Sequence, residues 1–181
     1  MEMFYLISGG SGSGKSEYAE TIAVRLAQEE KREKVYIATM MAFDEEAEKK
    51  IARHRCMRKE KQFKTVECFM KSSKLILPNN TIVLLDCLSN LLANEMYAED
   101  GAKEEAVQEI LNGMENIKEQ CVHFVLVTNE IYGDGCMYEQ ETQQYVKNLG
   151  TLNQMLAKIA DVVVEVVCGI PICYKGKELI K

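Results

Sequence analysis

The chain has 181 residues, 47% of them hydrophobic and 28% charged, which suits one folded domain and argues against a disordered chain. Asp and Glu number 28 against 22 Lys and Arg, and the net charge of −6 argues against nucleic acid or an anionic membrane surface as a partner. The seven cysteines include no Cys-x-x-Cys pair, and only two histidines accompany them. We therefore expect free thiols, no zinc site and a cytoplasmic location.

The chain begins with a short apolar run, "MFYLIS", that predicts a buried strand over residues 3–8. It is too short to cross a membrane, as is every later apolar run, so we expect no membrane insertion. A glycine-rich loop follows, and residues 15–30 then predict an amphipathic helix. Its apolar stripe consists of Ala19, Ile22, Ala23 and Leu26.

Strands and helices alternate along the rest of the chain. The further predicted strands are 34–39, 81–86, 123–129 (which contains His123, expected to be structural) and 162–167, with a short strand after them. The further predicted helices are 43–61, 88–97, 103–120 and a last one carrying Tyr145, Leu149, Leu152, Leu156 and Ile159 on one face, after a loop with Gly133 and Gly135. This alternation predicts a mostly parallel α/β sheet flanked by helices. No repeat or linker interrupts it, so we expect a single domain over 1–181.

The glycine-rich loop has the pattern Gly-x-x-x-x-Gly-Lys-Ser between a strand and a helix, which is the phosphate-binding loop (P-loop) of nucleotide-binding proteins. Its glycines let backbone N–H groups converge on phosphate oxygens, and the helix adds its positive end. We expect Lys15 to contact the β- and γ-phosphates and Ser16 to bind Mg²⁺. The whole loop consists of Gly9, Gly10, Ser11, Gly12, Ser13, Gly14, Lys15 and Ser16.

Polar residues follow two other predicted strands. Asp86 ends the strand 81–86, where P-loop proteins place a carboxylate that holds Mg²⁺; the alternative is a cap for the next helix. Asn129 and Glu130, in "VTNE", lie where open α/β sheets bind ligands, and they fit either a nucleotide contact or an ordinary turn. The sequence has no Asn-Lys-x-Asp motif for reading guanine.

The predicted helix 43–61 is strongly basic although the chain is acidic. His54 shares a face with Ala47, Ile51 and Arg58, which are three or four residues apart. A neutral imidazole is a competent nucleophile near pH 7, and the surrounding bases can neutralise a triphosphate. The spacing alone favours the alternative, a solvated basic helix end with an incidental histidine. The bases, with one just beyond the helix, are Lys49, Lys50, Arg53, Arg55, Arg58, Lys59, Lys61 and Lys64.

Several stretches together resemble one family, that of the bifunctional adenosylcobinamide kinases and adenosylcobinamide-phosphate guanylyltransferases of cobalamin biosynthesis. The resemblance covers essentially the whole chain in order and spacing. The stretches are "ISGGSGSGKS" (7–16), "YIATM" (36–40), "KIARHRCMR" (50–58), "TVEC" (65–68), "LLDCLSNLLANEM" (84–96), "LVTNE" (126–130), "LGTLNQMLAKIAD" (149–161) and "VVCGIP" (166–171).

The resemblance implies a RecA-like P-loop fold, a homotrimer, Mg²⁺, and two reactions with ATP or GTP. The first phosphorylates the aminopropanol arm of adenosylcobinamide. The second transfers a guanylyl group from GTP through a histidine, which the resemblance identifies as His54. The catalytic residues implied are His54 and Lys15, with Ser16 and Asp86 for the metal. Besides the P-loop, the nucleotide contacts implied are Arg53, Arg55, Arg58, Glu67, Asp86, Asn129 and Glu130.

Two other functions fit parts of this pattern. One is a small-molecule kinase with no guanylyl transfer, which the P-loop and Asp86 alone would support. The other is a nucleotide-dependent switch protein that binds partners, although the missing guanine motif opposes a GTPase switch. Release of pyrophosphate rather than phosphate from GTP separates guanylyl transfer from both.

Overall fold

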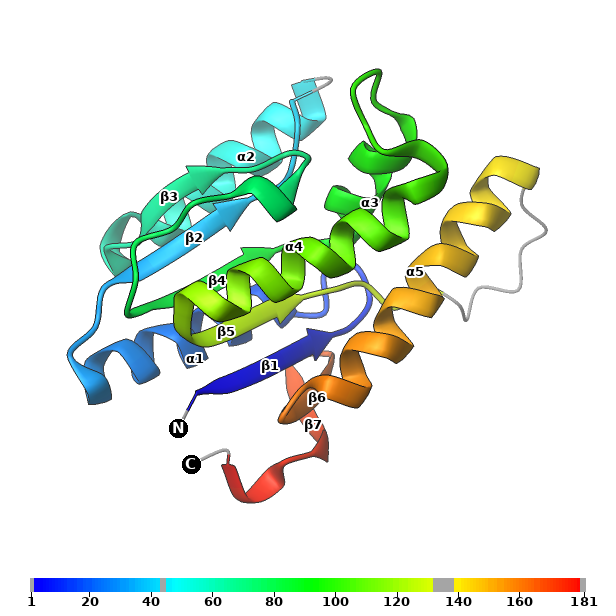
Figure 1. Cartoon of the computed structure of the whole chain (residues 1–181). Coiled ribbons are helices and arrows are strands. Elements are labelled where there is room, and N and C mark those ends of the chain that lie inside the picture. Colours follow the sequence, from blue (N-terminus) through cyan, green and yellow to red (C-terminus); the bar gives the residue numbers. More distant parts are fainter. Residues whose placement is uncertain (1, 43–44, 132–138, 180–181) are drawn as a thin grey trace.

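A computed structural model describes residues 2–42, 45–131 and 139–179, without the side chains of residues 46, 47, 50, 53, 54, 57–59 and 178. Seven strands form one sheet in the order β3-β2-β4-β5-β1-β6-β7 (Figure 1). All neighbours are parallel except β6 and β7. The strands are β1 (Met3–Ser8), β2 (Lys34–Ala38), β3 (Lys64–Glu67), β4 (Thr81–Asp86), β5 (Cys121–Val127), β6 (Val162–Val167) and β7 (Ile170–Lys175).

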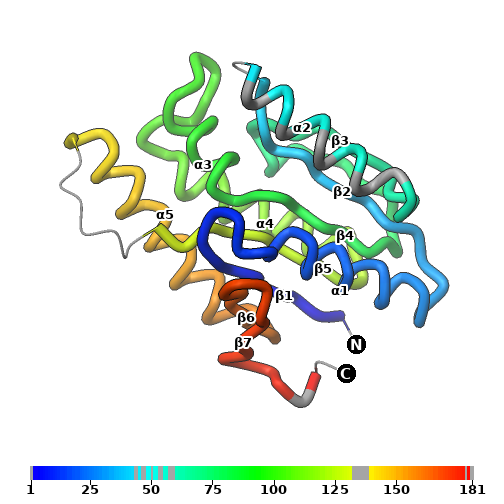
Figure 2. The backbone as a smooth tube through the Cα atoms, turned by 180° about the vertical axis from the view of Figure 1, so that it is seen from behind, coloured from blue at the N-terminus to red at the C-terminus, as the bar shows by residue number. Residues whose placement is uncertain are grey.

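Helices cover both faces of the sheet. Figure 2 shows α1 and α2 on one face, whereas α3, α4 and α5 cover the other face in Figure 1. The helices are α1 (Lys15–Glu30), α2 (Glu45–Arg58), α3 (Leu88–Tyr97), α4 (Ala106–Gln120) and α5 (Gln140–Ile159). The 3₁₀ turns are η1 (Lys59–Lys61), η2 (Ser72–Lys74), η3 (Lys103–Glu105) and η4 (Lys177–Leu179). Among the described residues, no helix is both long and apolar enough to cross a membrane.

The alternation of side chains along the strands divides the core in two. In β1, Phe4 and Leu6 pack with α3, α4 and α5, whereas Tyr5 and Ile7 pack with α1. Because both faces of the central strands are buried, these strands read as continuous apolar runs. The predicted α/β P-loop fold with a mostly parallel sheet is therefore confirmed.

The structure differs from the sequence predictions in several places. Strand β3 was not predicted, because it has only four residues and three of them are exposed. The predicted helix 43–61 ends in a 3₁₀ turn, η1, and the predicted helix 103–120 begins with one, η3. Strand β5 starts and ends two residues earlier than predicted. Ile159, placed on the apolar face of α5, is 55% exposed because it lies in the last turn of the helix.

Strand register brings the carboxyl ends of the strands to one edge of the sheet. Glu67 pairs with Ala38, Ala38 with Asp86, and Asp86 with Val127, which also pairs with Ile7 just before the P-loop. We call this the carboxyl edge, and the opposite edge the amino edge. The P-loop, Asp86, Glu67 and the "VTNE" segment therefore all lie along one line.

Candidate nucleotide site

The P-loop needs glycine at two positions of its backbone. Gly9 has φ 153°, and a Cβ there would lie 2.6 Å from both the Val166 carbonyl oxygen and Ser13 Oγ. Gly14 has φ 92° and caps the start of α1. Side chains are disfavoured in both conformations, so the motif glycines are required by the path of the chain.

Neighbouring segments fix the P-loop from two sides. The Glu130 backbone N–H, following β5, donates to the Gly9 carbonyl at 3.1 Å. The Gly169 N–H, in the tight turn between β6 and β7, donates to the Ser13 carbonyl at 2.8 Å. Apart from its place in "VVCGIP", this turn carries no signal by which sequence reasoning could single it out. The cradle is thus held by its own turn and by both strands that flank β1.

The side chain of Lys15 is buried within the P-loop. It is only 8% exposed, and its Nζ donates to the Gly10 carbonyl at 2.9 Å. Burial lowers the pKa of Lys15, whereas nearby Cys87 and Asp86 raise it. Since desolvation penalises the ammonium, an anion bound in the cradle would offset that cost.

Asp86 ends β4 as predicted, and the Tyr36 hydroxyl donates to its Oδ2 at 3.0 Å. Carboxylate and hydroxyl oxygens are of the kind that Mg²⁺ prefers, and the predicted metal role of Asp86 and Ser16 stays a prediction. The described part of the chain has no group of three or more His, Cys, Asp or Glu residues that could hold a metal ion alone.

Helix α2 brings one predicted pair of residues together. Arg55 Nη2 lies 2.8 Å from Glu67 Oε1 at the end of β3, and both side chains are exposed. Arg53, His54 and Arg58 lie on the backbone of α2, but their side chains fall outside the described part of the structure. Their predicted roles stay predictions.

The "VTNE" segment contacts other protein groups at the carboxyl edge. Asn129 Nδ2 donates to Ser89 Oγ, in the first turn of α3, at 2.6 Å. The Ser89 hydroxyl also lies 2.9 Å from Cys87 Sγ. Burial raises the pKa of the Cys87 thiol to about 11, so this thiol stays protonated near neutral pH. Whether Asn129 and Glu130 also contact nucleotide stays a prediction.

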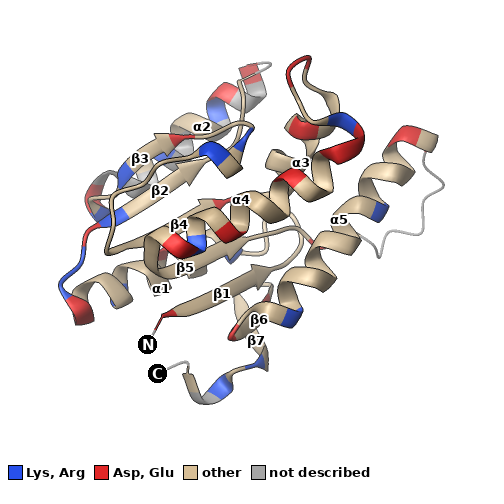
Figure 3. Ribbon diagram, viewed as in Figure 1, with Lys and Arg blue, Asp and Glu red and all other residues tan. Residues whose placement is uncertain are grey.

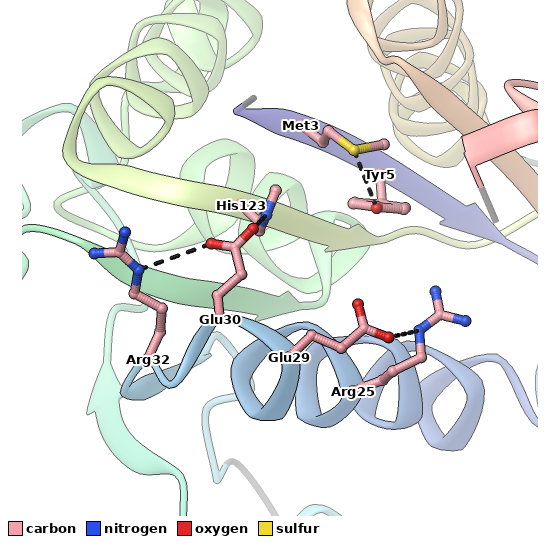
Figure 4. Close-up of polar contacts among 7 residues, drawn as sticks. All are labelled: Met3, Tyr5, Arg25, Glu29, Glu30, Arg32 and His123. Carbon is pink, nitrogen blue, oxygen red and sulfur yellow. Dashed lines mark hydrogen bonds and ion pairs between the residues drawn. The ribbon is translucent and has the colours of Figure 1, made fainter. Parts of the chain in front are cut away.

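The other histidine lies at the amino edge, as Figure 4 shows. His123 pairs with Met3, the first residue of β1, and its side chain is 2% exposed. Its Nε2 lies 2.8 Å from Glu30 Oε1, and Arg32 approaches the same carboxylate at 3.8 Å. This position at the far end of the strands from the P-loop agrees with the structural role expected for His123.

Four buried or half-buried polar residues at the carboxyl edge escaped the sequence analysis: Tyr36, Thr39, Ser89 and Asn94. Each contacts the backbone or a side chain of a segment remote in sequence, as in the bonds from Tyr36 to Asp86 and from Asn94 to Thr39. No local motif marks them. The only available signal was a polar residue among apolar ones in "YIATM" and "LLDCLSNLLANEM".

Comparisons with known proteins show the family. A family model described as cobinamide kinase / cobinamide phosphate guanyltransferase matches residues 5–174. The bifunctional adenosylcobalamin biosynthesis protein CobU of Escherichia coli (strain K12) is 31% identical, over 96% of this chain and 100% of the relative. The corresponding CobP of Pseudomonas aeruginosa is 32% identical, over 96% of this chain and 98% of the relative.

Solved structures share the fold at low sequence identity. Among them, flagellar accessory protein FlaH from Methanocaldococcus jannaschii gives a TM-score of 0.52 at 11% identity, and the match covers 96% of this chain and 78% of that protein. Similarity at this level concerns the fold alone.

Proposed function

The chain belongs to the cobinamide kinase / cobinamide phosphate guanyltransferase family, and from this premise we propose that it catalyses both reactions on adenosylcobinamide. It phosphorylates the corrinoid with ATP or GTP and then transfers GMP from GTP to the corrinoid phosphate. The observation that carries the proposal is the buried Lys15 in a glycine cradle next to Asp86, on a chain that matches the family over nearly its whole length.

In the kinase step, the terminal hydroxyl of the aminopropanol arm attacks the γ-phosphorus, and the nucleoside diphosphate leaves. Lys15 and the P-loop backbone stabilise the charge that spreads over the transferring group. Ser16 and Asp86 would hold Mg²⁺, which neutralises the phosphates when bound. Asn129 and Glu130 would line the same nucleotide, since their segment is bonded to the P-loop.

In the guanylyl step, the His54 imidazole attacks the α-phosphorus of GTP, a phosphorus–nitrogen bond forms, and pyrophosphate leaves. A phosphate oxygen of the corrinoid phosphate then attacks the same phosphorus and the bond to histidine breaks, which gives adenosylcobinamide-GDP and free His54. Arg53, Arg55 and Arg58 would neutralise the triphosphate, and Glu67 would orient Arg55. The place of His123 at the amino edge, away from the P-loop, supports the assignment of this role to His54.

We also propose that the chain is one domain over 1–181 and forms a homotrimer in the cytoplasm. The outer strand β7 supports association, because Ile170 and Tyr174 there are 65% and 67% exposed and an uncovered apolar edge strand invites pairing. The free cysteines of the described chain support a reducing compartment. A light-scattering mass of one 20.5 kDa chain at micromolar concentration would contradict the trimer.

The decisive experiment uses GTP labelled at the α-phosphate. The wild-type protein should become covalently labelled and release pyrophosphate, with a label that is lost in acid and survives alkali, as a phosphorus–nitrogen bond to imidazole does. His54→Ala should lose the label and the guanylyl transfer but keep kinase activity, because Lys15, Ser16 and Asp86 remain. A labelled His54→Ala protein would show that another residue is the nucleophile. A wild-type protein that has kinase activity but takes no label would mean that the chain is a kinase without guanylyl transfer.

A further inference from the structure

Three chain segments leave the carboxyl edge side by side, after β2, β3 and β4. They are Thr39, which follows β2 and leads toward α2; Phe69, which follows β3; and Cys87, which follows β4. The strand register ends at Ala38, Glu67 and Asp86, and two more backbone bonds follow. The Thr39 N–H donates to the Asp86 carbonyl at 3.5 Å, and the Cys68 N–H donates to the Ala38 carbonyl at 2.9 Å. What lies beyond must be fixed by other contacts.

The Thr39 side chain joins the first of these segments to the third. Its hydroxyl is fully buried, donates to the Cys87 carbonyl at 2.9 Å and accepts from the Cys87 N–H at 2.7 Å. One hydroxyl thereby satisfies both backbone groups of a buried residue next to Asp86. A hydroxyl is the smallest side-chain group that is at once donor and acceptor.

The Asn94 side chain, from α3, joins the first segment to the second. It is 5% exposed, and its amide nitrogen donates to the Thr39 carbonyl at 2.8 Å and to the Phe69 carbonyl at 3.0 Å. Both amide hydrogens are therefore used on the backbone of segments that lie beyond the paired parts of β2 and β3. We call the bonds of Thr39 and Asn94 the Thr39–Asn94 clamp.

Helix α2 is connected to two of these segments. Its entry point is the segment after Thr39, and the Arg55–Glu67 ion pair ties it to the segment that begins at Glu67. Both connections run into backbone that the Thr39–Asn94 clamp contacts, whereas the Lys61–Glu20 ion pair joins the following turn η1 to α1.

We propose that Thr39 and Asn94 are positioning residues for guanylyl transfer, acting by fixing where the chain leaves β2 and β3 and hence where α2 lies relative to Asp86. This rests on the proposed role of His54 on α2. The P-loop is outside the clamp, since it is bonded to Glu130 and Gly169 instead. Without the clamp, the Asp86 carboxylate still accepts the Tyr36 bond, and the strand that carries it, β4, still pairs with β5. Loss of the clamp therefore impairs guanylyl transfer more than phosphorylation.

The test compares Thr39→Val, which removes the hydroxyl, with Thr39→Ser, which keeps it. In single-turnover reactions with α-labelled GTP, Thr39→Val should lower the rate of protein labelling about 100-fold, the cost expected when a reacting group is misplaced by about 1 Å. In Thr39→Val, the KM for GTP and the kinase rate should differ from the wild-type values by less than about threefold. Thr39→Ser should recover most of the wild-type labelling rate.

Asn94→Ala provides a second variant, because its smaller side chain leaves space where water can satisfy the two carbonyls, and it decides the question if Thr39→Val does not fold. Asn116→Ala is the matched control, since Asn116 Nδ2 also donates to two carbonyls, those of Ser72 and Leu75, away from the site. The control should leave the ratio of the two rates unchanged.

Wild-type labelling rates in Asn94→Ala and Thr39→Val, or an equal fall in both reactions, would overturn the clamp as a positioning device. A failure of the proposed function itself is distinguishable, because it appears as absent labelling in the wild-type protein before any clamp variant is measured.

Discussion

The P-loop and helix α2 serve the same edge of the sheet but are held there in opposite ways. The P-loop is fixed through its backbone, by positive φ at its glycines and by hydrogen bonds from the segments after β5 and β6. Helix α2 is charged and largely exposed where described, as is the neighbouring β3 (Figure 3). Among its described side chains, that of Arg55 ties it to Glu67 at the end of β3.

The difference teaches that the two proposed chemistries can vary independently. A backbone cradle tolerates few substitutions, because each one changes the path of the chain. A tethered helix tolerates surface changes but depends on a few contacts. Among the described side chains these include the Arg55–Glu67 pair at the carboxyl edge and the ion pair between Lys61, in η1, and Glu20, in α1.

The largest expected effect is on the kinase reaction, at Lys15. Lys15→Ala should reduce phosphoryl transfer by at least about 100-fold, because such contacts are worth about 3 kcal/mol or more in the transition state. The fold should survive, since the lysine is a buried cation whose Nζ donates to a single backbone carbonyl, that of Gly10. Coupled-assay rates and circular dichroism measure the two outcomes. Lys147→Ala, an exposed lysine of α5, is the control, and full turnover in Lys15→Ala would refute the P-loop assignment.

A stability measurement tests the backbone side of the comparison. Gly9→Ala should lower the free energy of unfolding by about 3 kcal/mol, because its Cβ would lie 2.6 Å from the Val166 carbonyl in a conformation unfavourable to L residues. Gly10→Ala should change it by less than about 0.5 kcal/mol, because Gly10 has neither positive φ nor any heavy atom within 4 Å of the added carbon. Urea unfolding measures both. Equal values would mean that the loop adapts and that the contrast with α2 is wrong.

The same contrast explains what the sequence could predict. The bounds of β1 and α1 follow from residues that are neighbours in the chain: an apolar run, a glycine motif and a helical stripe. Strand β3 exists because it pairs with β2, and its four residues carry no local apolar pattern. Pairing partners are not written in a local stretch, so this strand was missed.

The site divides along the same line. Lys15, Ser16 and Asp86 could be placed from the motif and the strand ends. The Thr39–Asn94 clamp could not, because its two members are 55 residues apart and bond to backbone atoms, which every residue has. A hydrogen bond to a backbone atom therefore leaves no recognisable pattern in a single sequence.

The tethers of α2 supply the next prediction. Glu20 is 1% exposed, and its carboxylate lies 2.5 Å from Lys61 Nζ. Glu20→Gln removes one charge from this largely buried pair and should cost about 2 kcal/mol, less than a fully buried pair because the Lys61 side chain is 28% exposed. Glu67→Gln breaks the exposed pair with Arg55 and should cost less than about 0.5 kcal/mol. Thermal unfolding compares the two, and equal costs would show that the buried tether has no special role.

The smallest expected effect lies at the amino edge, which contains neither the P-loop nor helix α2. It therefore serves as a reference for both of these regions. The hydrogen bond from His123 lowers the pKa of Glu30 below its ordinary value of 4.5, since it favours the ionised carboxylate. Because the folded-state pKa is the lower one, the stabilisation is present above the ordinary pKa and is lost as pH falls through the folded-state pKa. Glu30 is about one-third exposed, so solvent screening limits the contribution to about 1 kcal/mol.

Glu30→Gln should therefore lower the free energy of unfolding by about 1 kcal/mol at pH 7, and the difference from wild type should shrink as the pH falls below 4.5. Glu29→Gln is the matched control one residue earlier, because Glu29 is more exposed and lies 4.0 Å from Arg25. It should change stability by less than about 0.5 kcal/mol at any pH. Urea unfolding at several pH values measures the differences, and neither variant should change the labelling or kinase rates. A change in either rate would mean that the amino edge influences the reactions at the carboxyl edge. The comparison of the P-loop with α2 would then have to include the amino edge as a third region.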